Sequence, residues 1–302
     1  MNLIKNLWSI LRFICKHPLH KNRRFAAIMN FVRWQVGMRL INKKVVVPWV
    51  EDAKILSGLG EFGLTGNIYC GFMEHEDMLF LLHVLRPEHT FVDVGANVGA
   101  YTILASKVVG SKSVAFEPLP ETAARLKDQV QINQIENLVD VRNIGVGDRE
   151  CELNFTNNSD TVNKVSLSDA AENTTRVRVG VLDRELSLDG EYFLKVDVEG
   201  FESQVIRGAK KILASGRVLA MIVELNGRGV EFGHTNEEVH QKILSYGLVP
   251  VSYEPLGRRV TRLDGFNQNE GNTLYVKSVE QVEALVSSAP RRTVHTANSI
   301  RL

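Results

Sequence analysis

Cysteine is scarce in this sequence, and the cysteines that occur are too far apart to suggest a shared role. The 302 residues contain only Cys15, Cys70 and Cys151. There is no C-x-x-C pair and no zinc-finger spacing, and an odd number of widely separated cysteines is not typical of a disulfide framework. The sequence therefore predicts free thiols in a reducing compartment, which favours a cytoplasmic protein.

Acidic residues are absent from the first 44 residues, which contain ten Lys or Arg, although the whole chain has a net charge of only +1. Apolar residues recur at helical spacing over residues 2–17 and 23–40, so residues 1–44 are predicted to form a basic amphipathic helical extension. Its uncharged runs are much shorter than the roughly 20 residues that a membrane span needs. No signal-peptide cleavage site precedes Lys16. Two interpretations stay open: peripheral contact with the inner face of an anionic membrane, or packing on the catalytic domain or a second subunit of a homo-oligomer.

Two common nucleotide-binding signatures are missing from the most distinctive glycine turn, which lies between a predicted strand at Phe91–Val94 and a predicted helix at Val98–Val108. A dinucleotide fingerprint would need glycine at 97 and 100, where the chain has Asn97 and Ala100. A P-loop would need Gly-Lys-Ser or Gly-Lys-Thr, which is also absent. The motif that remains, Asp-x-Gly-x-x-x-Gly, places an acid at the strand end, which would repel a pyrophosphate but suits a ligand with a cationic amino-acid end.

This turn resembles motif I of the class I S-adenosylmethionine-dependent methyltransferases. The resemblance implies that five residues in and around the turn contact the cofactor: Asp93, Gly95, Asn97, Gly99 and Tyr101.

Strand-like and helix-like segments alternate from residue 91 to residue 276, which predicts an α/β fold with a doubly wound parallel sheet. Residues 45–285 are assigned to this domain, opening with short strands or a hairpin lid over 45–69. Edge strands are expected at 151–156 and 176–179, around a polar insertion at 157–175. Residues 286–302 are expected to be a flexible tail.

Ligands bind at the carboxyl ends of the strands in open α/β sheets, so acids at those ends are informative. Glu117 ends the second predicted strand 22 residues after Gly95, the distance at which an acid accepts hydrogen bonds from ribose hydroxyls. Asp148 follows the third strand and either accepts from an adenine amino group or occupies a turn. Asn97 either binds the methionine carboxylate or caps the helix.

A second group of ionisable residues lies in the segment Lys195–Glu202. Strand alternation would place Lys195, Asp197 and Glu199 on one side of a buried strand, and such residues are costly there unless they pair or function. Glu224 and Asn226 end the next predicted strand in the same region.

With these motifs the chain resembles the FkbM-family methyltransferases from about Gly71 to Val276. The carriers are Phe91–Gly99, Phe116-Glu117-Pro118, Leu194–Glu202, Gly208-Ala209 and Val223-Glu224-Leu225. The resemblance implies a class I methyltransferase (Rossmann-like) sheet of seven strands with the last antiparallel. It also implies methyl transfer from S-adenosyl-L-methionine to oxygen, on a hydroxyl of a glycan or of a small-molecule natural product.

The expected catalytic residues are Asp197, Glu199, Lys195 and Glu224. Asp197 and Glu199 are candidate bases for the acceptor hydroxyl, Lys195 pairs with one of them, and His234 is a weaker candidate. No metal is required in this reading. In a metal-dependent alternative, Asp197, Glu224 and Asn226 form an all-oxygen set suited to Mg²⁺.

A competing function is a membrane- or complex-associated protein with a vestigial cofactor pocket, organised by residues 1–44. Nucleic acid is not an expected partner, because the Asn/Asp-Pro-Pro-Tyr signature of amino-group methylation is absent after the fourth strand. The insertion 157–175, with Thr161–Lys164, and the loop 226–236 are expected to shape the acceptor site.

Overall fold

A computed structural model describes residues 2–21, 23–58, 61–156, 165, 174–269, 271–296 and 299–302. Its centre is an eight-stranded sheet in the order β12-β11-β13-β10-β9-β3-β4-β5. In chain order these strands are β3 (Thr90–Val94), β4 (Lys112–Phe116), β5 (Val139–Arg142), β9 (Tyr192–Val196), β10 (Val218–Leu225), β11 (Val249–Glu254), β12 (Arg259–Arg262) and β13 (Gly271–Val276).

The sheet is mainly parallel, which confirms the predicted fold class. β13 is antiparallel to both of its neighbours, β10 and β11, as expected for the last strand. The expected number of seven strands is too low, because β12 folds back on β11 and pairs with it through Tyr253 and Val260. Val260 is buried while its neighbours on β12 are exposed, so one inward side chain fixes this extra edge strand.

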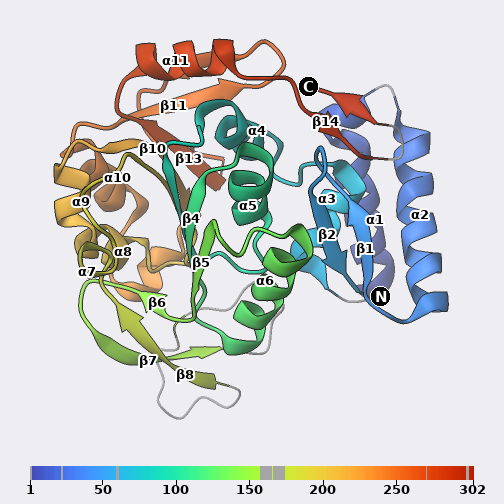
Figure 1. The fold of residues 1–302 in the computed structure, drawn as a ribbon, viewed down its shortest axis with the longest axis horizontal. Coiled ribbons are helices and arrows are strands. Elements are labelled where there is room, and N and C mark those ends of the chain that lie inside the picture. Colours follow the sequence, from blue (N-terminus) through green and yellow to red (C-terminus); the bar gives the residue numbers. More distant parts are fainter. Residues whose placement is uncertain are drawn as a thin grey trace.

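Side chains alternate between two helical layers that cover the sheet. Phe91 packs into one core, whereas Val92 and Val94 pack into the other, and β10 divides its residues in the same way. Figure 1 shows α4, α5 and α6 on one side of the sheet and α7 to α10 on the other. The first layer contains α4 (His75–Val84), α5 (Ala100–Ile103), the π-helix η2 (Leu104–Val109), α6 (Pro120–Asn133) and α11 (Val279–Ser288); the second contains α7 (Leu182–Glu185), α8 (Glu202–Gly208), α9 (Lys210–Ala214), η3 (Arg228–Phe232) and α10 (Asn236–Leu244).

The predicted helical extension is present as α1 (Asn2–Lys16), the short η1 (Pro18–His20) and α2 (Arg24–Ile41). α1 and α2 lie side by side at one end of the molecule (Figure 1). Ile14 and Phe31 are buried in the same core as the helices of the first layer, so the extension packs on the domain. Among the described residues, no helix combines the length and apolar character that crossing a membrane requires.

The segment before the sheet contains a hairpin of β1 (Val45–Pro48) and β2 (Lys54–Ser57), as predicted. Amide side chains of α6 bind the second strand, β2: Asn133 and Gln129 accept the backbone N–H groups of Lys54 and Leu56 at 2.8 and 2.9 Å. Residues expected to continue as strands form a helix instead, α3 (Phe62–Cys70).

The expected edge strands form a separate small sheet rather than an edge of the central one. β7 (Cys151–Thr156) pairs with β8 (Thr174–Gly180), which also pairs with β6 (Gly145–Val146). Of the insertion expected at 157–175, Thr161–Lys164 lie outside the described residues.

The segment expected to be a flexible tail is ordered where the structure describes it. β14 (Thr293–Val294) pairs with β15 (Ile300–Arg301), and Val294 is fully buried and bridged to Val50. Prediction failed here because the contacts are non-local: the polar sequence around Pro290 gives no sign that its neighbours dock on the β1–β2 hairpin.

Candidate functional site

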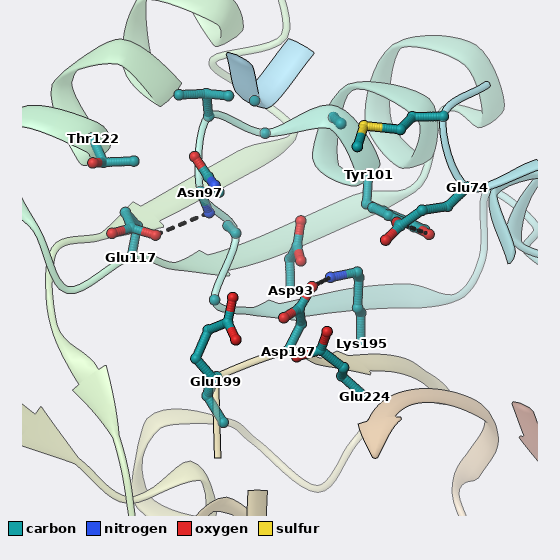
Figure 2. A pocket seen from close by; sticks show the side chains of 18 of the residues that line it. Glu74, Asp93, Asn97, Tyr101, Glu117, Thr122, Lys195, Asp197, Glu199 and Glu224 are labelled. Atoms are coloured by element: carbon teal, nitrogen blue, oxygen red, sulfur yellow. Dashed lines mark hydrogen bonds and ion pairs between the residues drawn. The ribbon is translucent and has the colours of Figure 1, made fainter. Parts of the chain in front are cut away.

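A cavity of about 340 Å³ opens at the carboxyl ends of β3, β4, β9 and β10, where ligands bind in open α/β sheets. Figure 2 shows carboxylates from several strand ends pointing toward this space. Its lining includes Gly63, Asn67, Met73, Glu74, Met78, Asp93, Gly95, Asn97, Gly99, Tyr101, Glu117, Thr122, Phe155, Lys195, Asp197, Glu199 and Glu224.

The glycine turn after β3 brings the backbone to the floor of the cavity. Gly95 has φ +82°, and a Cβ there would lie 1.9 Å from the carbonyl oxygen of Asp197. The N–H groups of Gly95 and Ala96 both donate to the carbonyl of Phe116, which ties the turn to β4. Only glycine therefore allows the turn to pass this close to the end of β9.

Glu117, directly after β4, supports the same turn from the other side. Its carboxylate accepts the N–H of Asn97 at 2.9 Å (Figure 2). It also accepts the N–H of Leu119 at 3.0 Å. Burial raises the pKa of Glu117 to about 7. A carboxylate has about four acceptor positions, so two bonds to the protein leave capacity for hydroxyl groups of a ligand.

Asp93 is almost completely buried at the end of β3. One carboxylate oxygen, Oδ2, accepts the hydroxyl of Thr102 at 2.7 Å, while Oδ1 has no partner among the described residues. The side-chain oxygen of Asn97 is similarly buried and unpartnered there. Burial raises the pKa of Asp93, and the nearby Lys195 opposes this rise.

Lys195 is the buried cation of the site. Its Nζ contacts Asp197 Oδ2 at 2.6 Å and lies 4.8 Å from the centre of the Tyr101 ring. The Tyr101 hydroxyl in turn donates to Glu74 at 2.6 Å. The surrounding acids, led by Asp197, raise the pKa of Lys195 despite its burial, so it stays charged.

Three carboxylates meet on the other side of Lys195: one oxygen each of Asp197, Glu199 and Glu224 lies within 4.8 Å of the others. Burial and the neighbouring acids raise the pKa of Glu224 to about 9, and its Oε2 is buried without a partner in the described chain. Glu199 forms an ion pair with Arg228. Burial also raises the pKa of Glu199.

The structure brings most of the predicted site residues together, although not all by the predicted means. β9 ends at Val196, so Glu199 does not alternate along a strand but occupies a left-handed turn with φ +55°. Asp148 is exposed and Asn226 donates to Glu199 at 3.5 Å, and neither lines the cavity. His234 is buried beside Gly229, also outside the lining.

Several lining residues were not among the predicted site residues. Asn67, Met73 and Glu74 come from α3 and the loop after it, whose sequence carries no ligand-binding signature. Thr122 and Phe155 join the lining from α6 and β7.

Residues 93–249 match the family described as methyltransferase FkbM domain, which is more than half of the chain and includes both acidic strand ends. The chain belongs to the FkbM methyltransferase family. This finding confirms the resemblance inferred from the glycine turn and the acidic segments, and it makes the protein an S-adenosylmethionine-dependent methyltransferase by class.

One curated relative of this FkbM methyltransferase is the AMB antimetabolite synthetase AmbE of Pseudomonas aeruginosa, 38% identical over 74 residues, or 24% of this chain. The match spans only 3% of the length of that relative.

Solved structures that match this chain include an rRNA methylase, a second methyltransferase and the protein TYW2. An rRNA methylase from Streptococcus thermophilus is 13% identical, with a TM-score of 0.35 over 66% of this chain and 91% of that one. Precorrin-6y C5,15-methyltransferase from Geobacter metallireducens is 13% identical, with a TM-score of 0.37 over 67% and 86%. TYW2 from P. horikoshii, in complex with MeSAdo, is 12% identical, with a TM-score of 0.41 over 81% and 82%.

Proposed function

We propose that this cavity binds S-adenosyl-L-methionine and that the enzyme transfers its methyl group to a hydroxyl of a glycan or of a small-molecule natural product. The observation that carries the cofactor assignment is a set of buried oxygen acceptors without partners in the described chain, Asp93 Oδ1, Asn97 Oδ1 and Glu224 Oε2. Buried acceptors favour a ligand that brings donors and positive charge. A pyrophosphate would bring neither.

In this proposal, the two acids next to the glycine turn, Asp93 and Glu117, bind different parts of the cofactor. Glu117 holds the ribose hydroxyls with its remaining acceptor positions, while Asp93 and Asn97 face the amino-acid end. Asn97 can present either its oxygen or its amide nitrogen, because the two are assigned from their surroundings. For Asp148, which is exposed and outside the cavity lining, both interpretations stay open: a contact to the adenine amino group or a position in a turn.

The bound cofactor supplies an activated methyl group, so the chain mainly has to align the acceptor oxygen and remove its proton. Alignment of this kind is worth roughly 7–11 kcal/mol. Of the two predicted bases, Asp197 is held by the ammonium of Lys195. Glu199 is the better base, because burial raises its pKa and Arg228 fixes its position. Glu199 would accept the proton of the acceptor hydroxyl, and the bound cofactor would supply the methyl group that replaces this proton.

The alternative Mg²⁺ set of Asp197, Glu224 and Asn226 is not assembled, because the Asn226 amide is directed at Glu199. Lys195 already places a buried positive charge beside Asp197. We therefore propose a reaction without a metal ion.

Calorimetry with S-adenosylmethionine, S-adenosylhomocysteine, NAD and ATP tests the cofactor assignment. Binding of the first two but not of NAD or ATP is expected, with a loss of more than about tenfold in Glu117→Ala. Tight uptake of NAD or ATP, without binding of the sulfonium compound, would overturn the proposal. No binding of any of the four would instead favour a vestigial pocket.

The acceptor class is proposed from chemistry and from one relative. The signature of amino-group methylation is absent after β9, where the chain has Asp197 and Glu199, and the matching AmbE is named as an antimetabolite synthetase. Sugar nucleotides, lipid-linked oligosaccharides and polyketide alcohols should be screened for uptake of labelled methyl. Stable ether products would support oxygen transfer, whereas label on amines or RNA would contradict it.

We also propose that α2 contacts an anionic membrane surface. One stripe of α2 is buried through Phe31 and Met38, but a second stripe of large apolar residues is exposed. Phe25 is 78% and Leu40 81% exposed, with Val32 and Val36 between them at helical spacing. The surplus of Lys and Arg in residues 1–44 matches a negatively charged lipid surface.

Vesicle flotation tests this contact. The full chain should float with vesicles that contain phosphatidylglycerol, and the double variant Phe25→Glu/Leu40→Glu should not. Val46→Glu, at a half-exposed position on β1, is the matched control. Equal flotation of all three proteins would remove the membrane proposal without affecting the cofactor assignment.

A further inference from the structure

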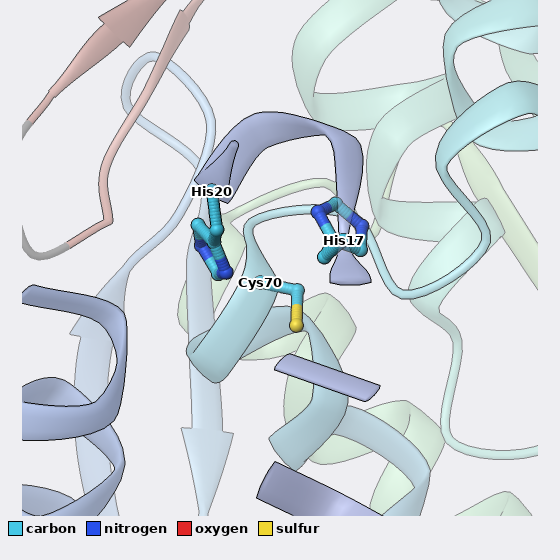
Figure 3. Close-up of side chains that lie close together, drawn as sticks. All are labelled: His17, His20 and Cys70. Atoms are coloured by element: carbon cyan, nitrogen blue, oxygen red, sulfur yellow. The ribbon is translucent and has the colours of Figure 1, made fainter. Parts of the chain in front are cut away.

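Three metal-ligating side chains meet far from the acidic pocket, at the corner between α1 and α2. His17 is the N-cap of η1, His20 is the last residue of η1, and Cys70 is the last residue of α3. All three are buried, and one ring nitrogen of each histidine and the Sγ of Cys70 lie within 4.8 Å of one another. Figure 3 shows the two rings on either side of the Cys70 side chain.

The hydrogen bonds of the two histidines leave one ring nitrogen of each available. His17 Nε2 lies 2.6 Å from the carbonyl oxygen of Phe72, and His20 Nδ1 lies 2.9 Å from that of Ile14. A carbonyl accepts, so these nitrogens carry the protons. The opposite nitrogen then presents a lone pair: Nδ1 of His17, which has only a long 3.4 Å contact with the N–H of Leu19, and Nε2 of His20. Metal-binding histidines commonly donate their second N–H to a backbone carbonyl in this way.

We propose that His17 Nδ1, His20 Nε2 and Cys70 Sγ bind one Zn²⁺ ion, and that the ion ties the helical extension to α3. A thiolate with two imidazoles is a soft to borderline donor set, which suits zinc and does not suit Mg²⁺ or Ca²⁺. On binding, the sulfur–zinc bond replaces the S–H bond, and the thiol proton passes to solvent. Both histidines ligate as neutral rings and lose no proton.

A fourth side chain is placed to complete a tetrahedral set. The His75 ring centre lies 5.4 Å from that of His17, and the buried Nδ1 of His75 has no hydrogen-bond partner among the described residues. A structural zinc site is almost always four-coordinate. His75 can therefore reach the ion by a side-chain rotation, and water can fill the position otherwise.

The site has a consequence for the methyltransferase pocket. Cys70 ends the helix that lines the pocket through Gly63 and Asn67, and the loop that follows supplies Met73 and Glu74. An ion fixed to Cys70 would hold this wall of the pocket against the extension. This inference does not depend on which cofactor or acceptor the pocket takes.

Metal content and a cobalt spectrum test the proposal on the purified full-length protein. Stoichiometric zinc should survive dialysis against a weak chelator, and Co²⁺ should replace it with a thiolate-to-cobalt charge-transfer band. Cys70→Ser and His20→Gln should each weaken zinc retention by more than about tenfold. Cys151→Ser, on β7, should retain metal and spectrum unchanged.

The cobalt experiment on the unmodified chain needs no variant, so misfolding of Cys70→Ser cannot decide the outcome. Failure of the wild-type protein to take up zinc or cobalt would overturn the proposal. So would cobalt bound without a thiolate band, because that result places the ion on the carboxylates of the acidic pocket. Zinc retained in full by folded Cys70→Ser and His20→Gln, as judged by circular dichroism, would also overturn it.

Discussion

The ionisable residues around the pocket are largely buried, and several of them lack a partner of opposite charge. Asp93 and Glu117 are almost fully buried, and Lys195 is the cation that compensates this region. At Glu224, burial and three neighbouring acids outweigh the opposing effect of Lys195, which raises the pKa of Glu224 to about 9 and favours its protonated form. Such an arrangement is costly in a free protein and is typical of sites whose ligand completes the balance of charge.

A methyl group added at Gly95 should damage the site far more than one added at another left-handed glycine. Gly110 also has positive φ, but nothing lies within 4 Å of a Cβ placed there, so Gly110→Ala should cost only the backbone strain of roughly 1–2 kcal/mol. Gly95→Ala adds a collision with the carbonyl of Asp197 and should lose about 2 kcal/mol more. Urea denaturation measures both changes.

Cofactor calorimetry separates the two glycine variants further. We expect Gly95→Ala to lose binding by more than about tenfold, because the turn must shift, while Gly110→Ala keeps it. Equal stability losses and equal binding in the two variants would show that the close approach of the turn to β9 is unimportant.

Lys195 and Asp197 should behave as a coupled pair. Lys195→Met leaves Asp197 and Asp93 without their cation and should cost about 3–5 kcal/mol, the usual effect of breaking a buried ion pair. Adding Asp197→Asn should recover about 0.5–3 kcal/mol of that loss. A double-mutant cycle by chemical denaturation measures the coupling, and strictly additive effects would contradict the pairing.

At the scale of elements, the parts fixed by local sequence were the parts that could be predicted. The glycine turn carries its acid and its two glycines within seven residues, directly after the strand β3. The acids at 197 and 199 were predicted to share a site, and they do. Their position in a turn was missed, because alternation cannot show where a strand ends.

α3 shows why other elements could not be predicted. Gly63 and Gly66 argue against a helix by propensity. The helix forms because Leu64 and Ile68 are buried, and a Cβ at Gly66 would lie 2.5 Å from the sulfur of Met73. A glycine that lowers helix propensity is therefore required by packing, which only the tertiary structure reveals.

The docked segment around β14 gives a direct test at this scale. Val294→Ala should lower the free energy of unfolding by about 1–3 kcal/mol, because the side chain is fully buried. Val46→Ala, at a half-exposed strand position, should change it by less than about 0.5 kcal/mol. Thermal denaturation of both variants checks this, and an unaffected Val294→Ala would return the segment to the status of a flexible tail.

At the scale of the whole molecule, one sheet positions a site whose walls come from the family domain and from the chain segment that precedes it. β3, β4, β9 and β10 provide the acids, while α3 and its loop, which precede the family match, provide another wall. The division into an extension at 1–44 and a domain from 45 onward remains a proposal, because the two share one core.

Stability of the ligand-free protein should fall as pH rises from about 7 to about 9. The folded pKa of Glu224, about 9, is above its ordinary value of 4.5, so the folded state binds more protons than the unfolded state in this range. The stabilisation that protonated Glu224 contributes is therefore fully present below pH 4.5, and it is lost as the pH rises through the folded pKa of about 9. Between pH 7 and pH 9 the free energy of unfolding should fall by at least about 1 kcal/mol.

Thermal melts across this pH range, with Glu224→Gln as the comparison, measure the effect. Glu224→Gln keeps the side-chain shape without an ionisable group, so its melting temperature should change less between pH 7 and 9. A wild-type protein that becomes more stable over this range would contradict the assignment of a protonated Glu224.

The pairing of Val50 with Val294 joins chain segments that are made far apart in time. Glu51 also binds this late strand, accepting the N–H of Thr293 at 2.6 Å. During synthesis on the ribosome, this part of the core cannot form until residues 293 and 294 have emerged and can pack against the β1–β2 hairpin. Until then Val50, which is fully buried in the complete fold, lacks the strand that pairs with it.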